Sequence, residues 1–132
     1  MKTHTTNFFN AFIQIADDCP TKSGVIPPEK TPKTIARAQY EMLIAAPYKH
    51  TSDDVIYATT GQPKGITRED FFSKPVACLR ASALTRRYGW GAHFDAEGKV
   101  ALYCAASAEY ARLAADPGLK QVKAMRQEKE KA

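Results

Sequence analysis

Residues 90–104 constrain the fold more than any other segment, because they carry the pattern of a β-hairpin. Residues 95–98, Asp-Ala-Glu-Gly, suit a type I turn followed by a glycine in the left-handed region, which commonly joins two antiparallel strands. With Asp95 opposite Lys99, the register places Trp90 opposite Cys104. One face of the hairpin is then apolar: Trp90, Ala92, Phe94, Val100, Leu102 and Cys104. The other face, which we expect to be turned to solvent, carries Gly91, His93, Asp95, Lys99, Ala101 and Tyr103.

An apolar hairpin face needs further elements to cover it, and the preceding segments supply them. Residues 8–15 are rich in strand-forming side chains, and every second residue from Phe9 to Ile15 is apolar, which predicts a strand. Four prolines in 17–33 predict a long irregular loop, a kind of segment that often covers or binds something. Residues 34–46 have apolar side chains at helical spacing, with a threonine cap at the start and a proline after the end. Residues 55–60 are rich in β-branched side chains and favour a strand, although Thr51 and Asp54 also resemble a helix capping box.

Helical patterns predominate in the rest of the chain. A helix is predicted over 78–88 with Gly89 as its terminator, and another after Ser107. Pro117 suits the first position of a last helix, whose apolar stripe would be Leu119, Val122 and Met125. The order of elements predicts the α+β class: a small sandwich made of a mainly antiparallel sheet with helices packed on it.

The length of 132 residues fits a single domain over 1–132, with an ordered core over about 6–126 and a basic C-terminal tail over 127–132. No apolar run is long enough to span a membrane, and Met1–Asn10 does not resemble a signal peptide. The three cysteines have no CxxC spacing, which argues against a disulfide framework or a zinc site. We therefore expect a cytoplasmic protein that binds no metal and no cofactor.

The formal charge of +5 raises the question of polyanionic partners. Much of the excess is local, because the segment from Lys120 to Lys131 holds five basic residues against two acidic ones. A basic end of this kind is typical of a solvated tail. Nucleic-acid binding therefore ranks third among the functions considered, since no DNA- or RNA-binding signature is matched.

Known catalytic and nucleotide-binding signatures are absent from the sequence. A short segment nevertheless concentrates the ingredients of a ligand site: Arg80, Arg87, Tyr88, His93 and Tyr103. Arginine can clamp a carboxylate or phosphate, histidine can carry a proton near neutral pH, and tyrosine offers an apolar body with a polar tip. We interpret this cluster as a non-catalytic binding site for a small anionic ligand or an acidic protein partner. We expect Arg87 and His93 to share a pocket.

Other interpretations stay open. An enzyme of unrecognised type would use His93 as proton carrier, Arg80 or Arg87 as anion clamp and Tyr103 as hydrogen-bond donor. Structural explanations are simpler for individual residues: Trp90 packs in the core, arginines favour a helix C-terminus, and Cys78 is a structural thiol rather than a nucleophile. Asp53 and Asp54 start a helix or turn more simply than they form a catalytic pair.

Three short motifs carry a resemblance to a known family: Thr51-Ser52-Asp53-Asp54, Tyr88-Gly89-Trp90-Gly91 and Lys123-Ala124-Met125-Arg126. On these residues the chain resembles a family of small bacterial proteins classed as a domain of unknown function. The resemblance extends from Thr6 to Arg126. It implies a stand-alone bacterial protein, and it brings no activity, cofactor or catalytic residue.

Overall fold

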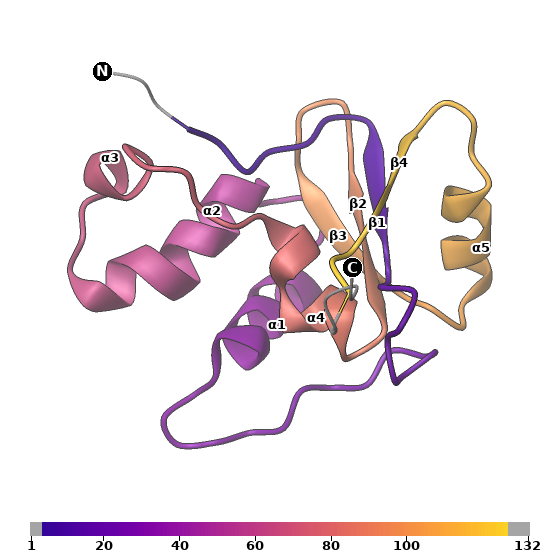
Figure 1. Cartoon of the computed structure of the whole chain (residues 1–132), viewed down its shortest axis with the longest axis horizontal. Helices are drawn as coiled ribbons and strands as arrows, with labels where there is room; N and C mark the ends of the chain where they lie inside the picture. Colours follow the sequence, from indigo (N-terminus) through magenta and orange to yellow (C-terminus); the bar gives the residue numbers. More distant parts are fainter. Residues whose placement is uncertain (1–3, 127–132) are drawn as a thin grey trace, which may run out of the picture.

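The computed structural model describes residues 4–126, which form one four-stranded sheet with helices on both of its faces (Figure 1). The strands are β1 (Ala11–Gln14), β2 (Trp90–Phe94), β3 (Val100–Cys104) and β4 (Lys120–Lys123), in the spatial order β3-β2-β1-β4. β1–β2 and β2–β3 are antiparallel pairs, and β1–β4 is parallel. The α+β class with a mainly antiparallel sheet is therefore confirmed. The tail predicted over 127–132 lies outside the described residues.

The hairpin forms in the predicted register. Trp90 pairs with Cys104, Ala92 with Leu102 and Phe94 with Val100. Gly98 has a φ of 80°, which a residue with a side chain adopts only with strain, and its N–H donates to the Asp95 carbonyl. The turn sequence alone thus sets the register of these two strands.

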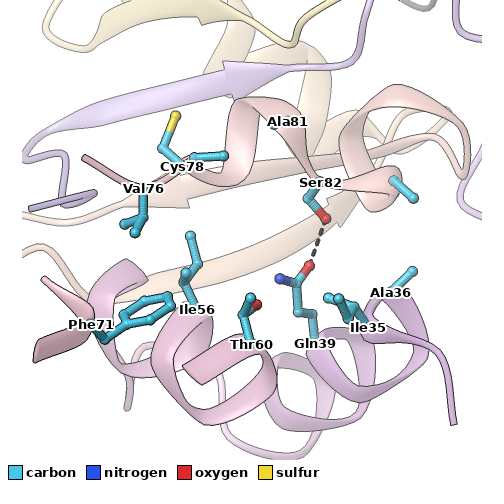
Figure 2. A pocket seen from close by; sticks show the side chains of 12 residues that line it. Ile35, Ala36, Gln39, Ile56, Thr60, Phe71, Val76, Cys78, Ala81 and Ser82 are labelled. Carbon is cyan, nitrogen blue, oxygen red and sulfur yellow. Dashed lines mark hydrogen bonds between the residues drawn. The ribbon is translucent and has the colours of Figure 1, made fainter. Parts of the chain in front are cut away.

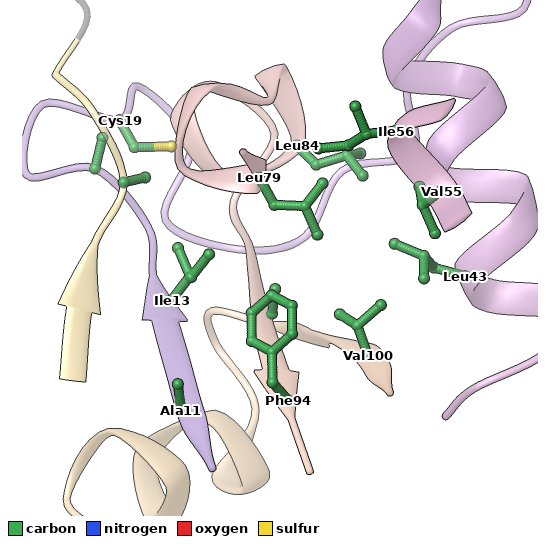
Figure 3. Close-up of a cluster of buried hydrophobic side chains, with 13 residues drawn as sticks. Ala11, Ile13, Cys19, Leu43, Val55, Ile56, Leu79, Leu84, Phe94 and Val100 are labelled. Atoms are coloured by element: carbon green, nitrogen blue, oxygen red, sulfur yellow. The ribbon is translucent and has the colours of Figure 1, made fainter. Parts of the chain in front are cut away.

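The main core lies on the apolar face of the hairpin (Figure 3). Phe94, Val100 and Ile13 from the sheet are fully buried there against Leu43, Leu84 and other side chains of the helical layer. That layer consists of α1 (Ile35–Ala45), α2 (Ser52–Ile56), α3 (Arg68–Phe71) and α4 (Ala83–Arg86). Burial of this apolar surface is the main force that holds the helices on the sheet.

The end of the hairpin at Trp90 is covered by the loop of 17–33 instead of a helix. The Trp90 Nε1–H donates to the Val25 carbonyl over 2.9 Å, and a Cβ on Gly24 would lie 2.8 Å from the indole ring. Gly24 N–H points at the Cys104 sulfur, 2.9 Å away. Trp90 and Cys104, predicted as core residues, are consequently only half-buried. The prediction that 17–33 is a long irregular loop is confirmed.

The hairpin alternation suggested that the second face of the sheet is open to solvent. In the structure this face is covered. Helix α5 (Ala108–Ala114) lies across it, on the side of the sheet opposite the other helices (Figure 1). Phe12 is fully buried there, with its ring 5.0 Å from that of Tyr110 in an edge-on arrangement. Gly91 is required at this point, because a Cβ would lie 2.6 Å from Tyr110. Only a tertiary contact between distant segments covers this face, so local patterns could not reveal it.

Two of the predicted helices are confirmed at nearly the predicted positions. α1 begins after Thr34, whose side chain accepts from the Arg37 N–H, and it ends before Pro47. α5 begins after Ser107, whose hydroxyl accepts from the Tyr110 N–H. The strand predicted over 8–15 is confirmed as β1, but it is shorter because Asn10 takes a φ of 47° and bends the chain.

The strand predicted over 55–60 is wrong. These residues belong to α2 and to a π-helical turn, η1 (Tyr57–Gly61), that follows it directly. Thr51 and Asp54 form the complete capping box, in which each side chain accepts from the other residue's backbone N–H. The cap satisfies the free N–H groups of the first turn, and Val55 and Ile56 are buried in the core. These two effects outweigh the β-preference of the branched side chains.

The helix predicted over 78–88 is interrupted at Ser82. The structure has a 3₁₀ turn, η3 (Leu79–Ala81), an extended Ser82 and then α4. The Ser82 hydroxyl accepts from the Leu84 N–H and caps α4, so the serine starts a new helix instead of continuing the old one. Gly89 ends the segment in the left-handed region with a φ of 77°, as predicted.

The last predicted helix is also wrong, because residues 120–123 form β4. Val122 points to the main core, and Lys120 and Ala124 donate their N–H groups to Asn10 and Gln14 of the β1 segment. Pairing with the unoccupied edge of β1 satisfies these backbone groups and buries Val122. This long-range pairing stabilises the segment more than a helix with a stripe of three apolar residues would. Within residues 4–126, no helix is long and apolar enough to cross a membrane.

Candidate functional site

A pocket of about 450 Å³ opens between two parts of the helical layer (Figure 2). One wall comes from α1 and from the α2–η1 helix, and the other from residues 76–83. No charged side chain lines it. The lining residues are Ile35, Ala36, Gln39, Ile56, Thr60, Phe71, Val76, Ala77, Cys78, Ala81, Ser82 and Ala83. We call this space the apolar pocket.

The apolar pocket exists because small side chains face one another across it. Ala36 on one wall and Ala77, Ala81 and Ala83 on the other leave the space that larger residues would fill. The interruption at Ser82 turns the chain so that η3 and α4 both contribute to the same wall. The other wall includes Thr60 of the π-helical turn, an irregular element that is frequent at functional sites.

One hydrogen bond spans the apolar pocket and sets its polar chemistry. The Ser82 hydroxyl donates to the Gln39 Oε1 over 2.6 Å, which orients the amide so that its NH₂ group turns toward Thr60 (Figure 2). The Gln39 Nε2 also lies 3.4 Å from the Thr59 hydroxyl, a long and weak contact. The pocket thus presents an amide donor and a threonine hydroxyl within otherwise apolar walls.

Cys78 lines the apolar pocket, but its sulfur points away from α1 and η1 (Figure 2). The thiol is free and half-buried. This orientation agrees with the structural interpretation of Cys78 over the nucleophilic one.

A second cluster of polar side chains lies on the α5 face of the sheet, around Tyr48. The Tyr48 hydroxyl is 2.8 Å from the His93 Nδ1 and 2.6 Å from the Tyr103 hydroxyl. Tyr48 reaches this face around the β3 edge, where its N–H donates to the Val100 carbonyl. The structure therefore brings together two of the predicted site residues, His93 and Tyr103, and adds Tyr48 between them.

Burial controls the protonation of this cluster. It lowers the pKa of His93, against the opposing charges of Asp95 and Asp116, so the neutral imidazole is favoured. Burial, together with the hydrogen bond to Tyr103, raises the pKa of the Tyr48 hydroxyl. A neutral Nδ1 that accepts from Tyr48 leaves the Tyr48 oxygen to accept from Tyr103, which gives a directed chain of two hydrogen bonds. Tyr103 also lines a shallow pocket of about 310 Å³ with residues of the α5 segment.

The remaining predicted site residues belong to the other side of the sheet. Arg80 Nε donates to the Lys123 carbonyl over 2.7 Å and so fixes the end of β4. Arg87 is exposed at the C-terminal cap of α4, which packs on the main core, whereas His93 faces α5. Tyr88 is half-buried, and its carbonyl accepts from the Val25 N–H. Arg87 follows α4 on the main-core side of the sheet, whereas the His93 side chain is on the α5 side, so a pocket shared by the two residues stays a prediction.

Asp53 and Asp54 have structural partners. The Asp53 carboxylate accepts from the Thr6 N–H, the Thr6 hydroxyl and the Thr5 hydroxyl, all within 2.7 Å, and ties the N-terminal segment to the start of α2. Asp54 caps α2 and pairs with Arg68 at 2.9 Å. No group of three or more metal-ligating side chains is arranged to hold an ion anywhere in residues 4–126.

Comparison with known families gives one match. The sequence model of DUF6157, a family of unknown function, matches residues 3–130. The chain belongs to this family. DUF6157 covers the three motifs on which the resemblance was recognised, while a bacterial origin stays a prediction. No curated protein and no solved structure matches this DUF6157 chain.

The residues of the apolar pocket in this DUF6157 chain were not predicted from the sequence. Gln39, Thr60 and Ser82 are single polar residues among apolar ones, and nothing local distinguishes them from ordinary surface positions. The run of alanines at 77, 81 and 83 was a usable signal, because small residues on one short segment leave space beside it. Tyr48 is not among the site residues that the sequence predicts.

Proposed function

We propose that this protein binds a small, largely apolar molecule in the apolar pocket. The observation that carries the proposal is the pocket itself: about 450 Å³, mainly apolar walls, and the Gln39–Ser82 hydrogen bond across it. Volumes of 300–1,000 Å³ and apolar walls with a few oriented polar groups are typical of small-molecule sites.

The polar groups add a preference for an oxygen atom on the ligand, which the apolar walls do not require. Gln39 offers an N–H donor and Thr60 a hydroxyl on one wall. A carbonyl, carboxyl or hydroxyl oxygen on the ligand would satisfy both, while the rest of the molecule would lie against Ile35, Ile56 and Phe71. Leaving such an oxygen unpaired in an apolar pocket would be unfavourable, which gives the site selectivity as well as affinity.

The class of function inferred from the sequence, a non-catalytic binding protein, is kept, while its location changes. A ligand site around Arg87, His93 and Tyr103 has only its His93–Tyr103 part supported by a described contact. Catalysis with His93 as proton carrier, nucleic-acid binding, an acidic protein partner and a cytoplasmic location stay predictions. None of them has as much geometric support as the apolar pocket.

The proposal is tested with N-phenyl-1-naphthylamine, a neutral apolar dye whose fluorescence rises in apolar surroundings. We expect saturable binding with one site per chain and a rise in melting temperature, since a ligand of the native state stabilises it. Ala81→Phe fills the pocket and is expected to weaken binding at least tenfold. Ala77→Phe, in an exposed irregular segment, fills the same space with less effect on folding.

The matched control is Ala111→Phe, which adds the same side chain to an exposed position of α5 on the other face of the sheet. It should bind the dye as the unmodified protein does. If no variant changes the binding, or if the dye does not saturate, the apolar pocket is not a ligand site.

A further inference from the structure

A second groove lies beside the apolar pocket, near the start of α1. It has a volume of about 380 Å³ and shares Ile35 and Thr60 with the apolar pocket. The residues that line it are Lys33, Thr34, Ile35, Ala38, Ala58, Thr59, Thr60, Pro63 and Lys64. We call it the lysine groove. The two spaces therefore meet at Ile35 and Thr60.

Charge differs sharply between the two spaces. The apolar pocket has no charged lining side chain, whereas the lysine groove has two lysines and no acidic residue. Lys33 already pairs with Glu41 at 2.6 Å. Lys64 stands at the end of a short 3₁₀ turn (Gln62–Lys64) and forms no ion pair with the residues from 4 to 126. A positive charge without an ion-pair partner among the described residues thus lies in the groove that neighbours the apolar pocket.

The junction between the two spaces is an exposed apolar side chain. Ile35 is 51% exposed although it borders both the apolar pocket and the lysine groove. An apolar chain lying across it would remove this surface from water. The charge at Lys64 and the exposed Ile35 both point to a molecule longer than the apolar pocket alone.

We propose that the ligand is a single-chain amphiphile with an anionic head group. The inference rests on the proposed function and specifies its ligand. The alkyl chain occupies the apolar pocket, crosses Ile35 and Thr60, and places its head group at Lys64, with Lys33 nearby in the same groove. A cationic head group would face two lysines, and a neutral one would leave Lys64 without a counter-charge.

The test compares three probes with the same ten-carbon chain by isothermal titration calorimetry: decanoate, decan-1-ol and decyltrimethylammonium. We expect decanoate to bind about three- to fivefold tighter than decan-1-ol, because a single exposed ion pair contributes at most about this much. The cationic probe should bind least well. Lys64→Gln should abolish the preference for decanoate, and 0.5 M salt should reduce it. Lys49→Gln, an exposed lysine beyond the far end of α1, is the matched control and should keep it.

Chain length tests whether the head group and the apolar pocket act together. Octanoate has two methylenes fewer than decanoate and should bind about tenfold more weakly. In Ala81→Phe this length dependence should disappear. Decyl phosphate in place of decanoate then distinguishes a phosphate head group from a carboxylate.

The outcomes separate the two proposals. Equal binding of decanoate and decan-1-ol, both lost in Ala81→Phe, overturns the anionic head group and leaves the apolar pocket as a ligand site. Decanoate binding that depends on Lys64 but not on Ala81 or on chain length is surface ion pairing, and it also overturns the inference. If none of the alkyl probes and no neutral dye binds, the proposed function itself fails.

Discussion

Tyr48 has an unusual backbone conformation. Its φ of 59° is in the left-handed region, which is uncommon for a bulky side chain and costs conformational energy. The surroundings hold it there: its N–H donates to Val100, and its hydroxyl bonds to His93 and Tyr103. These contacts fasten the segment after α1 to both strands of the hairpin.

Removing the Tyr48 hydroxyl tests this fastening. We expect Tyr48→Phe to lower the free energy of unfolding by about 1–2 kcal/mol, since His93 and Tyr103 both lose a partner in a half-buried site. Chemical denaturation measures the change. Tyr57→Phe removes the exposed Tyr57–Ile66 hydrogen bond and should cost less. In a double-mutant cycle with Tyr103→Phe the effects should not add, and additive effects would show that the three side chains are not one network.

His93 gives the protein a pH response with a definite sign. Burial lowers the pKa of His93 in the folded protein below its ordinary value of 6.5, so the unfolded chain binds more protons in the interval between the two values. The stability contribution from neutral His93 is therefore present above pH 6.5 and is lost as pH falls through that interval. Denaturation at pH 8 and pH 5 should show a smaller loss of stability for His93→Gln than for the unmodified protein. An equal or larger loss in the variant would contradict the assignment.

At the scale of elements, β4 shows how backbone direction decides the effect of a substitution. The N–H groups of Lys120 and Ala124 donate to the β1 segment. Because backbone N–H groups alternate in direction along a strand, the Val122 N–H also points toward β1. The Lys123 N–H points toward the open edge of the sheet. Val122 also packs against the core, whereas Lys123 is exposed and pairs with Asp17. The two neighbours thus have different roles in the same strand.

A proline at each position separates these roles. Val122→Pro should destabilise the protein by about 3 kcal/mol or more, because it removes a ladder hydrogen bond and an apolar contact. Lys123→Pro should cost about 1 kcal/mol or less, since it removes an outward N–H and an exposed ion pair. Urea denaturation of both variants gives the comparison. Equal losses would mean that β4 does not pair with β1 in this register.

For the molecule as a whole, the sequence predicted what depends on neighbouring residues. The hairpin register, the caps at Thr34 and Ser107 and the end of α1 are all set by short-range patterns, and all are confirmed. The errors at 55–60 and after Pro117 have different causes. At 55–60 the local capping box indicated the helix, but the β-preference of the branched side chains was given more weight. After Pro117 the outcome depends on pairing with β1, which no local pattern contains.

The candidate site follows the same division. His93 and Tyr103 were selected for their side-chain chemistry, the predicted register places them on one face of the hairpin, and they do meet at Tyr48. The apolar pocket is formed by α1, η1 and residues 76–83, which come together only in the folded protein. Its residues have ordinary side chains, so their role depends on shape rather than on chemical type.

The parallel pairing of β1 with β4 has a consequence for how the chain reaches its native state. β1 lies inside the sheet, and both of its partners are far along the chain: Ala11 pairs with Phe94 on one side and with Lys120 on the other. The β2–β3 hairpin needs only local contacts, and hairpins form within about 1–10 μs. β1 can pair with β2 and with β4 only after the long chain segments between these strands close into loops. Each loop closure costs entropy before any contact offsets it. We therefore expect the hairpin to act as the early template, with β1 and then β4 adding to it late, so that folding speed is limited by connectivity and not by the strength of the core.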